Sequence, residues 1–294
     1  MAIIECVPNI SEGRRTHVVD ACAVAITAGG AALLDVHRDP DHNRAVFTFA
    51  GAPAEVIASA HRLVDAAVNA IAIDSHEGVH PRVGVVDVVP FVPIARATIE
   101  ECVTMAREFA ANIARRHDLP VYLYEAAALR PYRRPLEAIR RGGLPGLAAR
   151  MTSDEWRPDY GPDRPHPTAG VTVVGARRPL IAFNINLATD RLDIARTIAA
   201  TIRQSSGGLP FVKALGLALA DQGLVQVSMN LTDFRVTSVR DVYDAVSREA
   251  ARHGVDLIES EIVGLVPEVA LSDAEAHAMN VRGFDGTQIL ERRL

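Results

Sequence analysis

The first 125 residues alternate between stretches with the two-residue period of strands and stretches with the 3.6-residue period of helices. Gly29-Gly30 should end the first helix, Pro53 should open the second, and Thr98 with Glu101 has capping-box spacing before the third. Pro90 lacks a backbone N–H donor, so its strand should lie at a sheet edge or contain a bulge there. The predicted strands are 2–7, 32–37, 45–51, 83–92 and 119–125, and the predicted helices are 16–28, 53–72 and 98–117.

The last third of the chain repeats this order of elements. It predicts strands at 180–187, 211–219, 224–232 and 255–264, with helices at 191–204, 238–253 and, closing the chain, 267–279. Up to the fourth strand this is β-α-β-β-α-β, the order of ferredoxin-like folds, and the first 125 residues show it with one extra helix and strand. We therefore expect an α/β (α+β) protein of two ferredoxin-like βαββαβ subdomains, 1–178 and 179–294, with a ligand groove between them.

Residues 142–170 differ from both halves. They are rich in Gly and Pro and show little periodicity, which is typical of a linker or of a long functional loop.

Composition excludes several classes of protein. Hydrophobic residues make up 49% and charged residues 23%, which indicates a globular chain with a sizeable core. The net charge of −5 argues against a nucleic-acid partner. Three scattered cysteines favour a reducing, cytoplasmic location, and MAIIECVPN does not have the pattern of a signal peptide. No apolar run approaches the roughly 18 residues of a membrane helix, so we expect no membrane contact.

The stretch DSHEGVHPRVG contains a match to the zinc-protease motif H-E-x-x-H, from His76 to His80. That motif requires a helix, which places both histidines on one face. Gly78 inside the motif and Pro81 directly after it disfavour a helix, and the stretch precedes a strand. A zinc hydrolase is therefore a distant alternative, and we expect no metal.

Polar side chains gather at the turns of the first half. Any one of them alone is typical of turn structure, but together they are typical of a site built on loops. Asn184, Asn186 and Asn230 interrupt apolar strands, so they either pair internally or bind a polar ligand. The turn residues are Asn9, Glu12, Arg14, His37, Asp39, Asp41, His42, Asn43, Arg44, His76, His80 and Arg82.

Taken in one order, several motifs resemble those of the glutamate formimidoyltransferase family. They are ECVPNISEGR (5–14), DPDHNRAVFTFAG (39–51), HEGVHPRVGVVDVVPFVP (76–93), LPVYLYE (119–125), PDYGP (158–162), LIAFNINL (180–187), QVSMNLTDF (226–234) and SEIVGLVP (260–267). No single motif is specific, but together they cover nearly the whole chain.

The resemblance implies an activity and its partners. The family transfers a formimino group from N-formimino-L-glutamate to N5 of the co-substrate tetrahydrofolate, commonly as a homodimer. It implies that His80, in the family's H-P-R motif, is the catalytic histidine. It also implies that folate binds within the Gly/Pro-rich stretch, at Gly161, Pro162, Asp163, Arg164, Pro165, His166, Pro167, Thr168, Ala169 and Gly170.

Histidine suits this transfer because its ordinary pKa of about 6.5 lets it take and give protons near neutral pH. His37, Asp39 or His42 would orient His80 or stabilise the cationic formimino group. Arg44, Arg82 and Lys213 are candidate partners for the carboxylates of both substrates. The full set of expected substrate-binding residues is Asn9, His42, Asn43, Arg44, Arg82, Asn184, Asn186 and Asn230.

Val79 and His37 differ from the pattern of animal members of the family, which have acidic residues at those positions. Two alternatives therefore stay open beside formimino transfer. One is formyl transfer between glutamate and tetrahydrofolate on the same scaffold. The other is a folate-binding protein without transfer activity.

Overall fold

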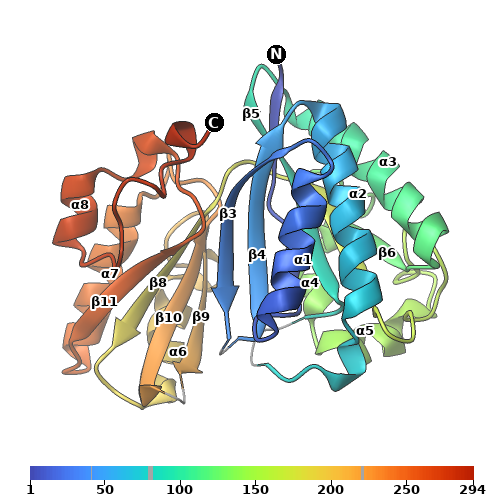
Figure 1. Cartoon of the computed structure of the whole chain (residues 1–294). Coiled ribbons are helices and arrows are strands. Elements are labelled where there is room, and N and C mark those ends of the chain that lie inside the picture. The colour runs from blue at the N-terminus through green and yellow to red at the C-terminus, as the bar shows by residue number, and fades with distance from the viewer. Residues whose placement is uncertain (41, 79–81, 220–221) are drawn as a thin grey trace. The chain divides into compact units, whose positions relative to one another are not determined.

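The computed structural model describes residues 1–40, 42–78, 82–219 and 222–294. The chain forms two compact units, Met1–Arg177 and Arg178–Leu294, and each is built around its own sheet (Figure 1). This arrangement confirms the expected α/β class. Within the described ranges, no helix is both long enough and apolar enough to span a membrane.

The first unit has a seven-stranded sheet. β1 and β2 each pair with both β4 and β5, so they act as one strand interrupted at residues 7–8. The spatial order is then β3-β4-β1/β2-β5, the ferredoxin-like arrangement, and β7 and β6 extend it in parallel beyond β5. The strands are β1 (Ile3–Cys6), β2 (Asn9–Ile10), β3 (Ala32–Asp39), β4 (Arg44–Gly51), β5 (Val86–Ala95), β6 (Val121–Glu125) and β7 (Thr172–Ala176).

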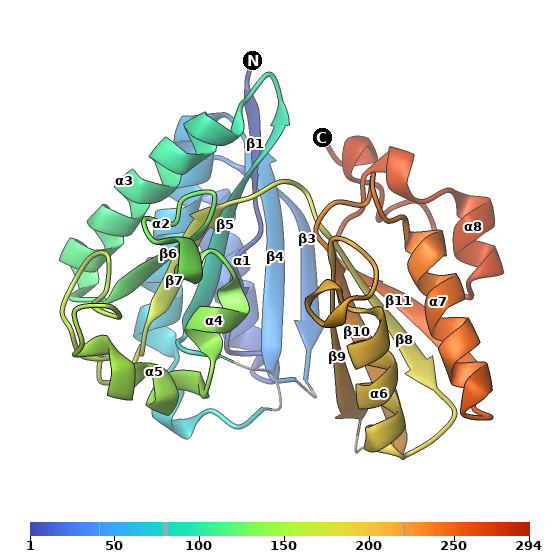
Figure 2. The same ribbon diagram turned by 180° about the vertical axis from the view of Figure 1, so that it is seen from behind.

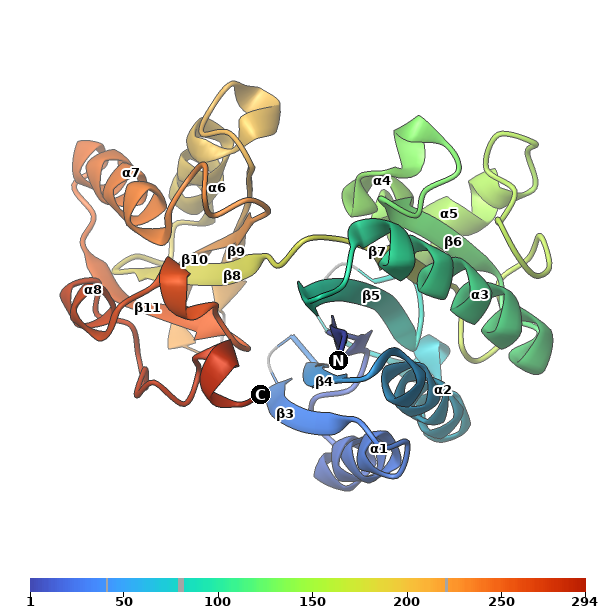
Figure 3. The ribbon, with the colours of Figure 1, turned by 90° about the horizontal axis from the view of Figure 1, so that it is seen from above.

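Helices cover both faces of this sheet (Figure 3). On one face lie α1 (Thr16–Thr27), α2 (Pro53–Ala70) and α3 (Ile99–His117), and on the other α4 (Leu136–Arg140) and α5 (Gly143–Met151). Alternate strand residues divide between the two cores, since Val174 packs with the first set and Val173 with the second.

Every strand and helix that was predicted for the first 125 residues is present. Thr98 and Glu101 form the predicted capping box, with the Glu101 amide 3.2 Å from Thr98 Oγ1.

The structure departs from the sequence prediction for this unit at three places. The stretch 142–170 is not wholly a loop, because 143–151 form α5 despite a poor helix-forming sequence: Leu147 and Met151, four residues apart, are buried in the second core. The short buried strand β7 was not predicted at all. Pro90 lies in an interior strand rather than at an edge, and its carbonyl accepts the Val7 amide at 3.3 Å. The pairing of β5 shifts register on either side of Pro90, opposite Ile3–Ile4 and opposite Asn9–Ile10, but not at Pro90 itself.

The second unit has a four-stranded antiparallel sheet with the order β11-β8-β10-β9. This is again the ferredoxin-like order. α6 and α7 pack on one face (Figure 2), over a core that includes Phe183, Ile185 and Met229. The elements are β8 (Ile181–Leu187), α6 (Leu192–Ile202), β9 (Val212–Leu219), β10 (Leu224–Leu231), α7 (Val239–Arg252), β11 (Leu257–Val263) and α8 (Asp273–Ala278).

The predicted closing helix, 267–279, is not continuous. A short 3-10 helix, Glu268–Ala270, is followed by extended backbone at Leu271, and α8 starts afresh after Ser272. Ser272 and Glu275 form a capping box, with the Glu275 amide 3.3 Å from Ser272 Oγ. Because the backbone at Leu271 is extended, the first amides of α8 have no preceding helical turn to bond to, and the Ser272 cap supplies an acceptor.

Candidate functional site

Asn43 joins three distant segments at the turn between β3 and β4. Its backbone is left-handed (φ 49°), a conformation that Asn tolerates better than most residues. Its side-chain oxygen accepts the Gly13 amide at 2.9 Å, and its side-chain nitrogen donates to the Glu77 carbonyl at 2.9 Å. Gly13 permits this close approach, because a Cβ there would lie 2.3 Å from the Asp39 carbonyl oxygen.

His76 makes the next contact of this polar cluster. Its Nε2 lies 2.7 Å from the Asn43 carbonyl oxygen, which can only accept, so Nε2 carries the proton. Nδ1 is buried and has no partner among the described residues. Burial lowers the pKa of His76 below its ordinary value, which favours a neutral ring with a free lone pair at Nδ1. The first histidine of the motif, to which the sequence assigned no role, thus lies at the centre of the cluster.

The guanidinium of Arg82 binds the backbone of residues 76–78. Nη1 donates to the Gly78 carbonyl at 2.8 Å and Nη2 to the His76 carbonyl at 2.7 Å. His76 itself has an extended backbone (φ −83°, ψ 122°), not the helix that a zinc-protease motif needs. The predicted catalytic His80 lies outside the described residues. The described residues before and after it are joined by the hydrogen bonds of Arg82 to the carbonyls of His76 and Gly78.

A buried carboxylate, that of Asp87, binds the start of the chain segment that follows this bend. Asp87, on β5, is only 2% exposed; one oxygen accepts the Val83 amide at 2.7 Å and the other pairs with Arg140 of α4. Beside it is a cavity of about 10 Å³, about the room that one water needs. The cavity is too small for a substrate. It is lined by Ile10, Ser11, His42, Asn43, Arg44, His76, Arg82 and Asp87.

Asp39 and His42 form a carboxylate–imidazole pair at the end of β3. His42 Nδ1 contacts one Asp39 oxygen, and the His42 amide donates to the other at 2.9 Å. Burial alone would raise the pKa of Asp39, but these two bonds and the charges of His42 and Arg44 outweigh it and lower that pKa to about 2. Asp39 is therefore ionised near neutral pH. Since a carboxylate can only accept, His42 Nδ1 carries a proton in this contact.

We expect Asp39→Asn to destabilise the protein in a pH-dependent way. A carboxyl with a pKa of about 2 when folded and about 3.9 when unfolded stabilises the fold above about pH 4 and loses that contribution as the pH falls toward 2. The free energy of unfolding should drop by roughly 2 kcal/mol at pH 7, and the difference from the parent should shrink between pH 4 and 2. Urea unfolding at pH 7, 4 and 2.5 measures it. A difference that is the same at all three pH values contradicts the assignment.

The other predicted residues of this unit lie around the cluster. Asn9, on β2, donates to the Val7 carbonyl at 3.3 Å and so bridges the break after β1. His37 is half-buried on β3, opposite Val46. Arg44 starts β4 and lines the small cavity.

The segment expected to bind folate, 161–170, runs beside the stretch that holds the cluster. The Thr168 carbonyl accepts the Ile73 amide at 2.8 Å, and the Ala169 carbonyl accepts the Val85 amide at 2.9 Å. Gly84 lies against this segment so closely that a Cβ there would be 2.0 Å from the Val171 carbonyl oxygen. Two stretches about 85 residues apart in the sequence are therefore neighbours within the first unit.

Two side chains of this segment already have partners. His166 Nδ1 accepts the Ala169 amide at 3.0 Å, and the His166 and Gly170 backbones exchange two hydrogen bonds. Arg164 pairs with Asp118 at 3.1 Å, but both side chains are about 70% exposed, so this ion pair contributes little to stability.

The asparagines of the second unit point away from its helices, since they alternate with the core residues of β8 and β10. Asn184 donates to Glu261 at 3.3 Å and Asn186 to Glu259 at 3.0 Å. Arg282 joins both glutamates, at 3.2 and 3.1 Å respectively. Asn230 lies opposite Lys213 on β9. The pairing is thus internal for the first two asparagines, but with side chains rather than backbone.

Sequence reasoning missed Asp87 and Arg140, and it placed His76 among the turn residues without giving it a role. Asp87 had a recognisable signal, because a carboxylate inside the apolar run VGVVDVVPFV needs a buried partner. Arg140 had none, since it lies 53 residues away on a helix that was not predicted.

Comparison with known proteins finds similarity along the whole chain. The model of the formiminotransferase domain, N-terminal subdomain, matches residues 3–177, and the model of the formiminotransferase domain matches residues 182–285. A glutamate formimidoyltransferase of Streptococcus pyogenes is 44% identical over 99% of this chain and 98% of its own length. One of Thermoplasma acidophilum is 43% identical over 100% and 98%. The formimidoyltransferase-cyclodeaminase of Sus scrofa is 42% identical over 93% of this chain but 52% of its own length.

Proposed function

Because this chain belongs to the formiminotransferase family, we propose that it transfers the formimino group of N-formimino-L-glutamate to N5 of tetrahydrofolate. The products are 5-formiminotetrahydrofolate and L-glutamate. The observation that carries the proposal is the similarity to glutamate formimidoyltransferases, which spans both units and nearly the full length of two such relatives.

The chemistry asks for proton transfer at two nitrogens. N5 attacks the amidine carbon and forms a tetrahedral intermediate, which collapses by expelling the amine of glutamate. A proton must leave N5, and another must reach the departing nitrogen. We assign both transfers to the imidazole of His80, since a single histidine can act as base and then as acid near neutral pH.

The polar cluster supports a positioning role for the residues next to His80. Arg82 donates to the carbonyls of residues 76 and 78, and Asn43 donates to that of Glu77. These three bonds hold the chain directly before position 79 and link it to position 82. We therefore propose that Arg82 positions the catalytic stretch, in place of the carboxylate-binding role expected from sequence, because the described bonds of its terminal nitrogens go to backbone.

We propose residues 161–170 as the folate segment. Their hydrogen bonds to residues 73 and 85 support this assignment, since they bring the segment to the stretch that carries His80. Asp39 with His42 is the accompanying candidate for stabilising the cationic formimino group, because Asp39 stays ionised.

A transfer assay with two donors tests the function. With tetrahydrofolate as acceptor, kcat/KM for N-formimino-L-glutamate should exceed that for N-formyl-L-glutamate by at least about 10-fold, a difference of about 1.4 kcal/mol in transition-state binding. A formyl donor that reacts faster would favour formyl transfer. Folate binding without transfer from either donor would favour a binding protein.

A further inference from the structure

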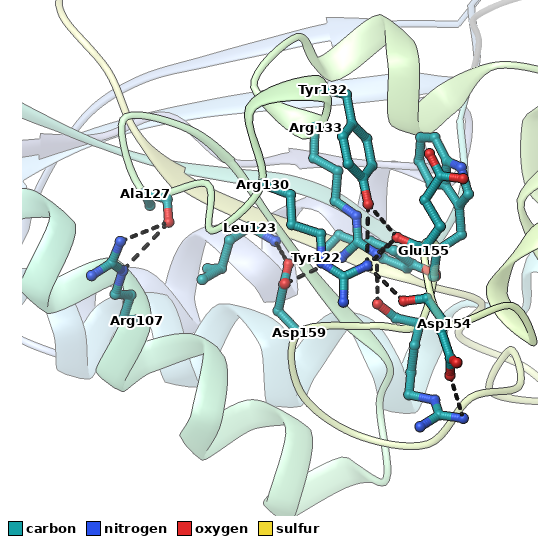
Figure 4. A network of polar contacts seen from close by, with 12 residues as sticks. Arg107, Tyr122, Leu123, Ala127, Arg130, Tyr132, Arg133, Asp154, Glu155 and Asp159 are labelled. Carbon is teal, nitrogen blue, oxygen red and sulfur yellow. Dashed lines mark hydrogen bonds and ion pairs between the residues drawn. The ribbon is translucent and has the colours of Figure 1, made fainter.

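Arg133 is a cation enclosed within the first unit (Figure 4). Its side chain is 0% exposed. The guanidinium carbon lies 5.0 Å from the ring centre of Tyr122, 5.6 Å from that of Trp156 and 5.8 Å from that of Tyr132. Removing a charge from water costs several kcal/mol, so a buried arginine needs both counter-charge and hydrogen-bond acceptors.

Among the described residues, the hydrogen-bond partners of the Arg133 guanidinium all belong to the segment that follows α5. Nη1 lies 3.2 Å from a carboxylate oxygen of Asp159. Nη2 donates to the Arg157 carbonyl at 2.8 Å and also to the Glu155 carbonyl. One planar guanidinium therefore binds every second residue from 155 to 159, which requires its fork of donors and not only its charge.

Asp159 also binds the sheet, through strand β6. Its second oxygen accepts the Leu123 amide of β6 at 2.7 Å, and its own amide donates to the Val121 carbonyl at 3.0 Å. Tyr160 continues the contact, because the Val121 amide donates to its carbonyl at 2.9 Å. Residues 155–160 are thus held against the end of β6 by the arginine on one side and by the strand on the other.

The next residue, Gly161, opens the proposed folate segment. Its backbone is left-handed (φ 82°), and a Cβ there would lie 2.0 Å from the Leu119 carbonyl oxygen. The position where the segment leaves the sheet therefore depends on how closely residues 155–160 lie against β6. Its far end is held separately, by hydrogen bonds of Ala169 and Val171 to the backbone at 83–85.

We infer that Arg133 is a positioning residue for folate binding: it fixes the start of the 161–170 segment through the backbone of residues 155–159. This inference rests on the proposed function, in that it takes folate as the ligand of that segment. An apolar side chain of equal volume would fill the same space, but it would remove the donor to the Arg157 carbonyl and the counter-charge of Asp159. The Glu155 carbonyl would keep Arg130 and Tyr132 as donors. Arg133 therefore acts on the geometry of the segment in addition to its packing.

The test compares Arg133→Lys with the matched control Arg107→Lys. Lysine keeps the charge but lacks the planar fork. Arg107 is another arginine of the same unit; it is half-buried, and its described hydrogen bonds go to one carbonyl outside residues 155–170, that of Ala127. For Arg133→Lys we expect the KM and Kd of tetrahydrofolate to rise about 10- to 100-fold, as loss of hydrogen bonds from a charged donor predicts. The KM of N-formimino-L-glutamate and kcat at saturating folate should stay within about 3-fold. Arg107→Lys should leave all four values within about 2-fold.

Amide hydrogen exchange without ligand gives a second readout that does not depend on the proposed function. Exchange at residues 160–170 should be at least about 10-fold faster in Arg133→Lys than in Arg107→Lys. If Arg133→Lys does not fold, Asp159→Asn serves instead, since it keeps the arginine and removes its counter-charge. The inference is overturned if exchange in the segment is unchanged, or if kcat falls while folate affinity stays the same. If exchange accelerates as expected but the parent binds no folate, the positioning role stands and the proposed function fails.

Discussion

Replacing His80 with alanine should reduce turnover by about 10²- to 10⁴-fold, the range typical for removal of a general acid–base. The reason is that two protons must move during formimino transfer, one from N5 and one to the leaving amine, and without the imidazole both must pass to water. The affinity for tetrahydrofolate should stay near that of the parent, because described backbone bonds join the proposed folate segment and Val171 to residues 73, 83 and 85.

Steady-state transfer assays and calorimetric titration with tetrahydrofolate measure the two quantities separately. His253→Ala is the matched control, since His253 caps the C-terminal end of α7 in the other unit and should be silent in both measurements. Added imidazole should restore part of the activity of His80→Ala and should not affect the control. Undiminished turnover in His80→Ala would remove the residue from the mechanism.

Gly84→Ala should weaken both the fold and folate binding. A methyl group at residue 84 would meet the carbonyl oxygens of Val171 at 2.0 Å and of Ala169 at 2.8 Å, and both are backbone atoms that cannot rotate away. The strand that follows the catalytic stretch and the end of the folate segment would have to separate. Overpacking of this kind costs typically 1–3 kcal/mol, or roughly 2–4 °C of Tm for each kcal/mol in a unit of this size.

Calorimetric melting and folate titration of Gly84→Ala measure these effects, and we expect the Kd of tetrahydrofolate to rise at least about 10-fold. Gly254→Ala is the control for the methyl group itself. A Cβ there meets nothing within 4 Å, so it bears only the cost of its left-handed backbone (φ 67°), roughly 1–2 kcal/mol. Equal losses of folate affinity in both variants would show that general destabilisation, and not separation of the two segments, is responsible.

Patterns within a few residues of each other were enough to predict most of the fold. The capping box of Thr98 and Glu101, the helix start at Pro53 and the alternation along β8 and β10 each depend on contacts within one turn or one strand. The same local patterns explain why the order of elements was predicted correctly in the first 125 residues and from β8 to β11. It also explains why α5 was missed, since Gly142, Gly143 and Pro145 argue locally against a helix that exists because Leu147 and Met151 are buried.

The partners of the polar side chains follow no such local rule. Asn43 binds Gly13 and Glu77, which lie 30 and 34 residues away on either side, and Asp87 pairs with Arg140, 53 residues further on. From the sequence, Arg82 was a candidate for substrate carboxylates; in the folded chain its described bonds go to backbone carbonyls of the preceding bend. The residue types alone indicated which side chains could bind a ligand or transfer a proton, because charge and hydrogen-bonding capacity are properties of each residue. The assignment of donor to acceptor came from the packing of distant strands and helices, which brings together groups that are far apart along the chain.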